Sequence, residues 1–416
     1  MKKLCFVIAF VWAIFGCDQI KNTVTYTVNE PVYMSFLEFR TTKGALPAQK
    51  MVNPGKICLY GDYLFINEIA KGIHVVDNSN PSVPKTVAFI ELVGNIDITA
   101  QDNILYADSF IDLVWFDITN PLRPVELGRA ENVFPNVLPA TGNEYPIKEV
   151  NWNKGVIVGW EVKTITEKEE FNPWYPCNGC YYDLRLSTAK LSSSGSGFTA
   201  VNGSMSRFAV YEDYLYVVNS GILKVFSLYE NTVIKVHEQY VGWNVETIFP
   251  YNDKLFLGTT TGMLIFGLSN PALPNHLSSM WHVLGCDPVV VQGNWAYVTI
   301  RGGNTCGQNL SLLNVIDISD PAAPVQRASY NMKEPYGLGI DGNRLFVCDQ
   351  GLMVFDATNP ITVGTKQIKH FGSIKGFDVI PYKGILMLIG NDGLFQYDYS
   401  DINNIKELSS IKVEKK

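Results

Sequence analysis

The stretch Leu313-Asn314-Val315-Ile316-Asp317-Ile318-Ser319-Asp320-Pro321 decides the fold, because the chain repeats it. The apolar residues predict a short strand, and the proline at the end cannot donate to a central ladder, so the strand must stop there. The clearest further copies lie at Ile73–Pro81, Leu113–Pro121 and Met353–Pro360. Asp77 and Asp117 are 40 residues apart, and Asp317 and Asp356 are 39 apart. A fixed period of this length indicates one repeated supersecondary unit.

Each unit predicts four short antiparallel strands. A Gly, Asn or Asp pair that suits a two-residue hairpin separates the first two apolar runs. These pairs are Gly61-Asp62, Asp102-Asn103, Glu212-Asp213, Asn252-Asp253, Gly293-Asn294 and Gly342-Asn343. Four strands in about 40–45 residues are typical of a β-propeller blade. One such sheet cannot bury both its faces alone, whereas a ring of sheets can.

The expected fold is therefore all-β, a β-propeller of four-stranded antiparallel blades. Units begin near Gly55, Gly94, Pro146, Ser206, Asn244, Gly285, Pro335 and Ile374. Eight blades are favoured; seven is the alternative, because the third unit is irregular. Two packed sandwiches are a less favoured architecture. Residues 17–54 are expected to supply a tether and an N-terminal edge strand, which would close the ring by pairing with the last blade.

The phrase Val315-Ile316-Asp317-Ile318-Ser319-Asp320-Pro321 resembles the LVIVD repeat, a β-propeller repeat of bacterial surface and secreted proteins. The chain as a whole resembles the LVIVD-repeat propeller lipoproteins common in Bacteroidetes. The likeness covers residues 55–412, and 161–205 departs from it as an insertion. The resemblance implies a fold and a cellular location, and it implies no catalytic residues.

The first residues predict export and lipid anchoring. Lys2 and Lys3 precede an apolar run of thirteen residues, Leu4–Gly16, which is too short to span a bilayer and fits a signal peptide at 1–16. Ile14-Phe15-Gly16-Cys17 resembles a bacterial lipobox, so Cys17 is the expected lipidation site; ordinary cleavage beside an incidental cysteine is the alternative. We expect an anchored protein of the cell envelope, at the outer membrane.

The composition excludes two classes of protein. The chain has 416 residues, 33 of them basic and 40 acidic, so its net charge of −7 argues against a nucleic-acid partner. Hydrophobic residues make up 47% and charged residues 18%, which excludes disorder as the main state.

The cysteines fit an exported protein that keeps disulfides. Cys286 and Cys306 bracket one strand-turn-strand segment, and Cys177 and Cys180 enclose an Asn-Gly turn, so these four are the disulfide candidates. The pairing of Cys58 and Cys348 stays open. No helical pattern follows Cys180, which argues against redox chemistry, and no second ligand pair supports zinc.

The innermost strand of each blade should line the central channel. Aligning the units by their turns places charged residues near the start of that strand: Asp97, Glu149, Arg207, Glu246, Asp287 and Asp378. An acidic ring could hold Ca²⁺ or a cationic ligand, although no DxDxDG-type loop is present. The alternative is that the acids pair with Arg207 and Lys56 and tie blades together.

The insertion at 161–205 carries a cluster of aromatic residues: Phe171, Trp174, Tyr175, Tyr181 and Tyr182. Long loops on rigid scaffolds often carry recognition, so these side chains are candidates for stacking on a sugar or a peptide. The alternative is that they cap the core of the third unit.

Two hypotheses of function follow from the sequence. In the first, a lipid-anchored propeller acts as a binding or scaffold module for an envelope protein or a glycan, without catalysis. In the second, channel carboxylates form the site of a hydrolase or lyase that acts on a polysaccharide, which would need two carboxylates about 5–9.5 Å apart in an open pocket. No nucleophile elbow or catalytic triad is visible, and no cofactor is expected. A purely structural envelope protein is a third reading.

Overall fold

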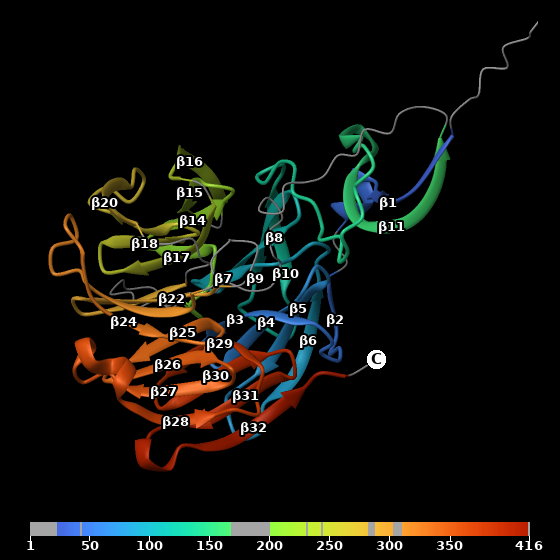
Figure 1. Cartoon of the computed structure of the whole chain (residues 1–416). Coiled ribbons are helices and arrows are strands. Elements are labelled where there is room, and N and C mark those ends of the chain that lie inside the picture. The colour runs from blue at the N-terminus through green and yellow to red at the C-terminus, as the bar shows by residue number, and fades with distance from the viewer. Residues whose placement is uncertain are drawn as a thin grey trace, which may run out of the picture.

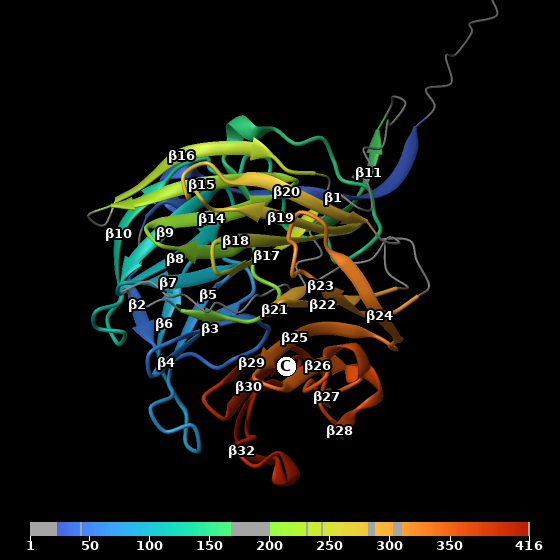
Figure 2. The same ribbon diagram turned by 90° about the vertical axis from the view of Figure 1, so that its left-hand side faces the viewer.

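The computed structural model describes residues 23–41, 44–167, 200–229, 232–242, 244–281, 288–302 and 310–414. These residues form seven antiparallel sheets arranged around a central axis, six of them with four strands and one with four blade strands and two further short strands (Figures 1 and 2). The predicted all-β propeller is thus confirmed. The number of blades is seven, the alternative, and the favoured number of eight was wrong.

Each blade runs from an innermost first strand to an outermost fourth strand. Blade 1 consists of β3 (Pro54–Tyr60), β4 (Tyr63–Glu68), β5 (Gly72–Asp77) and β6 (Lys85–Glu91), and blade 2 of β7 (Ile98–Gln101), β8 (Ile104–Ser109), β9 (Asp112–Asp117) and β10 (Val125–Ala130). Blade 3 consists of β13 (Phe208–Tyr211), β14 (Tyr214–Asn219), β15 (Ile222–Tyr229) and β16 (Thr232–Tyr240), and blade 4 of β17 (Val245–Tyr251), β18 (Lys254–Thr259), β19 (Gly262–Gly267) and β20 (Asn275–Trp281).

Blades 5 to 7 repeat the same order. They consist of β21 (Val289–Gln292), β22 (Trp295–Ile300), β23 (Leu312–Asp317), β24 (Val325–Asn331); β25 (Pro335–Asp341), β26 (Arg344–Asp349), β27 (Leu352–Asp356), β28 (Gln367–Phe371); and β29 (Gly376–Tyr382), β30 (Ile385–Gly390), β31 (Gly393–Asp398), β32 (Lys406–Lys412). Short 3₁₀ helices, η2 (Pro360–Thr365) and η3 (Ile402–Asn404), lie between the third and fourth strands of blades 6 and 7.

The predicted hairpin turns lie between the first and second strands. Asp102 and Asn103 have φ values of 52° and 63°, and Gly293 and Gly342 have 60° and 56°. This positive φ matches the right-handed twist of the flanking strands. The short apolar runs on both sides therefore pair directly with each other.

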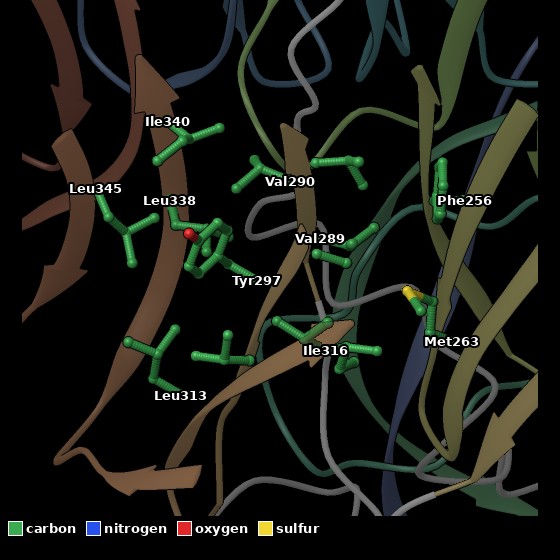
Figure 3. Close-up of a cluster of buried hydrophobic side chains, with 14 of the residues drawn as sticks. Phe256, Met263, Val289, Val290, Tyr297, Leu313, Ile316, Leu338, Ile340 and Leu345 are labelled. Atoms are coloured by element: carbon green, nitrogen blue, oxygen red, sulfur yellow. The ribbon is translucent and has the colours of Figure 1, made fainter. Parts of the chain in front are cut away.

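The core is a series of apolar layers between neighbouring blades. Between blades 4, 5 and 6, for example, Met263, Val289, Ile316 and Leu338 pack together and are almost fully buried (Figure 3). Because each blade has a neighbour on either side, its inner strands carry apolar residues on both faces and are buried in the ring.

The ring closes without exchange of a strand between the first and last blades. Blade 7 packs on blade 1 through an apolar cluster that includes Ile57, Leu64, Ile380 and Leu394. The Gln396 amide donates to Asn78 Oδ1 at 2.7 Å and to the Pro81 carbonyl at 3.1 Å. The prediction that an N-terminal strand pairs with the last blade was wrong. The short strand β2 (Ala45–Pro47) instead extends blade 1 on the outer side of β6.

The unit predicted to begin near Pro146 is not a blade. After η1 (Trp152–Lys154) its apolar run forms β11 (Val156–Glu167), which pairs with β1 (Val24–Met34). The two strands form a separate ribbon that extends from the propeller (Figures 1 and 2). The second strand of the expected blade thus has its partner more than a hundred residues earlier, and this pairing removes one blade from the ring.

Short helical turns and one buried ion pair hold the base of the ribbon. Helix α1 (Phe36–Phe39) follows β1 and buries Phe39. Arg40 binds the buried Asp112 of β9 with an Nε–Oδ2 distance of 2.8 Å. None of the helices among the described residues is long and apolar enough to cross a membrane.

Candidate functional site

Residues 200–207, which we call the plug, cross the central channel. Val201 and Asn202 form β12 (Val201–Asn202), a fifth strand on the inner edge of β3. The Ala200 amide donates to the Ala100 carbonyl of blade 2 at 2.8 Å, and the Ile248 amide of blade 4 donates to the Ser206 carbonyl at 2.8 Å. The plug therefore holds the innermost strands of separate blades together.

Ser204 extends these contacts to blades 6 and 7. Its hydroxyl accepts from the Leu338 amide at 2.7 Å and lies 3.3 Å from Asp378 Oδ1. The Ser204 amide donates to the same carboxyl oxygen at 3.2 Å. Ser204 is fully buried, and only small residues fit where several inner strands converge. The channel is thus filled by the chain itself at the level of its carboxylates.

Asp97 is the centre of a buried charged network. Its carboxylate is 2.5 Å from Lys56 Nζ, accepts from the Ser206 hydroxyl at 3.0 Å and accepts from the Arg207 amide at 2.8 Å. Burial lowers the pKa of Lys56 to about 8 even beside this carboxylate. Arg207 also binds Asp108 at 3.0 Å. Lys56 and Arg207 thus neutralise the carboxylates at this end of the channel, as the alternative interpretation of these acids expects.

Asp378 is a further buried carboxyl group in the channel. It is fully buried, and burial raises its pKa well above the ordinary value for an aspartate. Its Oδ2 atom has no hydrogen-bond partner among the described residues. A buried carboxyl group without a cation in direct contact favours the protonated form.

The other predicted channel residues are Glu149, Glu246 and Asp287. Glu149 is exposed in the connection before η1, so its placement in the channel was wrong. Glu246 is partly exposed on β17. Asp287 lies outside the described residues, as do all five aromatic candidates of the insertion and the four disulfide candidates. Cys58 and Cys348 are both free and buried, and burial raises the pKa of each thiol.

The described residues contain no group of three or more His, Cys, Asp and Glu side chains placed to hold a metal ion. A small cavity lies beside the plug, lined among others by Asp108, Phe110, Phe134 and Arg207. Its volume of about 20 Å³ is room for about one water molecule. This cavity is too small to hold a sugar residue of a polysaccharide chain.

Three exposed apolar side chains, together with one partly buried tyrosine, are found at the base of the ribbon. We call them the elbow patch: Phe36, Leu37, Trp152 and Tyr33. Leu37 is 83% exposed and Trp152 is 40% exposed. The Asn151 amide donates to the Tyr33 hydroxyl at 2.8 Å, which ties the two sides of the elbow together. Sequence reasoning missed this patch because it depends on the pairing of β1 with β11.

These features define the class: the chain is a seven-bladed β-propeller whose channel is filled by its own plug. Its blades contain LVIVD repeats. The family model of the LVIVD repeat matches residues 54–89, 202–225 and 286–332. No curated protein gives a significant match to the chain.

Solved structures share the fold at low sequence identity. A protein from Lactobacillus plantarum has a TM-score of 0.53 at 10% identity, and the periplasmic gluconolactonase of Pseudomonas aeruginosa has 0.52 at 14%. A putative 6-phosphogluconolactonase from Bacteroides fragilis has 0.52 at 9% identity. Each match covers 86% of this chain and 96% of the other. At these identities the likeness establishes the propeller fold alone.

Proposed function

We propose that the chain is a lipid-anchored propeller of the cell envelope, and that it acts as a binding or scaffold module through its outer surface. The observation that carries this proposal is the plug. It occupies the channel where propeller ligands could otherwise enter, and Lys56 and Arg207 already neutralise Asp97. Exposed apolar side chains remain at the elbow patch, where they are available to a partner.

The partner that suits the elbow patch is an envelope protein or a glycan. Trp and Tyr are frequent in the centres of protein interfaces, and their flat rings also stack on other flat or apolar surfaces. Lys154 lies over the Tyr33 ring, 5.6 Å from its centroid, so the patch combines an aromatic surface with a positive charge.

Paired substitutions test this binding surface. Full-length chain would be cross-linked to envelope extracts and, in a second arm, mixed with a purified polysaccharide fraction. The variant Leu37→Ser/Trp152→Ala should lose the partner. Trp281→Ala is the matched control, because Trp281 is 69% exposed on the distant strand β20. Equal retention by both variants would exclude the elbow patch, and Trp174→Ala and Tyr181→Ala would then test the aromatic loop.

Lipidation of Cys17 has its own test. Metabolic labelling with an alkyne fatty acid should mark the wild-type chain, and Cys17→Ser should abolish both the label and sedimentation with membranes. A Cys17→Ser chain that still carries label or stays with membranes would contradict the anchor. Asp18→Ala serves as a control that leaves the acceptor cysteine in place.

The hydrolase alternative has no specific support in the site. The buried carboxyl groups of Asp97 and Asp378 are bonded to the plug. The lactonase activities in the names of two structural neighbours belong to those proteins. We therefore carry forward only the binding module.

A further inference from the structure

The outer half of β11 presents an open strand edge. Among the described strands, β11 pairs only with β1, and none of them lies along its other edge. Residues 161–164 are exposed; Val162 is 50% exposed, and the side chains of Glu161 and Lys163 are 61% and 43% exposed. An open edge of this kind is a template for a further strand.

A further strand would increase the stability of the ribbon more than that of the blades. A two-stranded ribbon is only marginally stable in water, and further strands increase its stability. Near the propeller Trp160 fixes the ribbon, since its Nε1 donates to the Pro139 carbonyl at 2.7 Å. The ribbon of β1 and β11 extends away from the blades (Figure 1).

The charges along β11 are complementary to those of a second copy. In an antiparallel pair symmetric about Val162, Glu161 faces the partner subunit's Lys163, and Lys163 faces the partner subunit's Glu161. Both charges already lie on one face of the strand, with Lys163 Nζ 2.9 Å from Glu161 Oε2. The dimer would therefore set four charges in alternation on that face, and opposite charges across strands are stabilising.

Neighbouring registers are less favourable. A pair symmetric about Lys163 would place two lysines opposite each other, and a pair symmetric about Glu161 would do the same with two glutamates. Like charges directly opposite destabilise a sheet. On the other face the favoured register brings the two exposed Val162 side chains together. The sequence of β11 thus selects one register.

We propose that two copies of this chain associate through β11, forming a four-stranded sheet centred on Val162. The proposal is independent of the ligand of the elbow patch and of lipidation. Because the interface is isologous, it closes on itself and yields a dimer and no larger polymer.

A cysteine on the symmetry axis tests the register directly. Opposite residues of antiparallel strands have Cα atoms about 4.5–5.5 Å apart, within the range of a disulfide. Full-length Val162→Cys should therefore give a covalent dimer under mild oxidation that disappears on reduction. Thr166→Cys is the matched control: it lies on the same face of β11, but its two copies would be about 26 Å apart.

Charge variants complete the test by sedimentation of the full-length chain. Lys163→Glu should abolish the dimer, because four acidic side chains would then meet. Glu161→Lys/Lys163→Glu should restore it, since the swapped charges are again complementary and Lys at 161 can pair with Glu30 directly across the ribbon. A monomer at all concentrations, or a Val162→Cys cross-link no stronger than that of Thr166→Cys, overturns the proposal.

Discussion

An aspartate at the end of the third strand stops that strand in five of the blades. Asp317 Oδ1 accepts from the Ser319 amide at 3.0 Å and from the Ser319 hydroxyl at 2.6 Å, and these bonds together with Arg327 lower its pKa to about 2. The same bond to the amide two residues on is made by Asp77, Asp117, Asp356 and Asp398. These contacts span two residues, which is why the repeat could be predicted from the sequence alone.

The residues of the channel were predicted less well, because their partners are distant in sequence. Asp97 and Arg207 were both among the predicted channel residues, but nothing in the local sequence marks Ser204 and Ser206 as their neighbours. Asp108, which binds Arg207, was missed because it lies at the end of the second strand and resembles an ordinary turn residue. Glu149 was misplaced because the unit to which it was assigned does not form a blade.

Asp378→Asn should change how stability depends on pH. The native pKa of Asp378 is raised, so the folded state holds its proton more tightly than the unfolded state, whose pKa is about 3.9. This contribution to stability is full below pH 4 and is lost as the pH rises towards the native pKa. Thermal melts between about pH 4 and 7 should show that the wild type loses stability relative to Asp378→Asn.

The neighbours of Asp378 determine how this experiment is controlled. Lys56 and Asp97 act on the carboxyl group from blades 1 and 2, Ser204 bonds to it from the plug, and the thiol of Cys348 lies near it on β26. Since the lowered pKa of Lys56 is about 8, measurements below pH 7 keep that lysine charged. A constant difference between the two proteins across the pH range would contradict a raised pKa.

At the scale of elements, the first residue of the third strand of blade 7, β31, has to be a glycine. Gly393 has a φ of 121°, and a Cβ atom there would lie 2.0 Å from the Ile411 carbonyl oxygen of β32. The fourth strand could not then approach β31 at its present distance. This close approach explains the glycines that precede the apolar runs, a pattern visible in the sequence but not interpreted there.

Gly393→Ala should therefore destabilise the protein by clearly more than Gly342→Ala. Gly342 also has a positive φ, of 56°, but a Cβ atom there would meet nothing within 4 Å. Its substitution should cost only the backbone strain, about 1–2 kcal/mol. Denaturant unfolding measures both; equal losses would mean that β32 moves aside without cost.

The blade count shows where element-level reasoning failed. Residues near Pro146 have an apolar run and a glycine like the other units, but no third-strand aspartate motif follows them. Hairpins form locally, so six of the seven blades could be predicted from their own turns. The pairing of β11 with β1 is long-range, and no local pattern specifies it.

At the scale of the whole molecule, the plug and the ribbon should differ in mobility. The amides of Ala200, Ser204 and Arg207 donate to acceptors inside the ring, so their exchange requires opening of several blades. The amides near Val24 and Thr25 lie at the exposed end of the ribbon. Hydrogen exchange should be slowest in the plug and fastest at the end of the ribbon; rapid exchange at Ser204 would mean that the plug leaves the channel readily.

The position of the plug in the chain also has a consequence for biogenesis. It is synthesised after blades 1 and 2 and before blades 4 to 7, to three of which it bonds. The plug therefore does not have to be threaded through a finished ring. The later blades can assemble one after another around the plug, which has already emerged from the ribosome. A chain without the plug would have to close its ring of blades with no segment in the central channel to bond to.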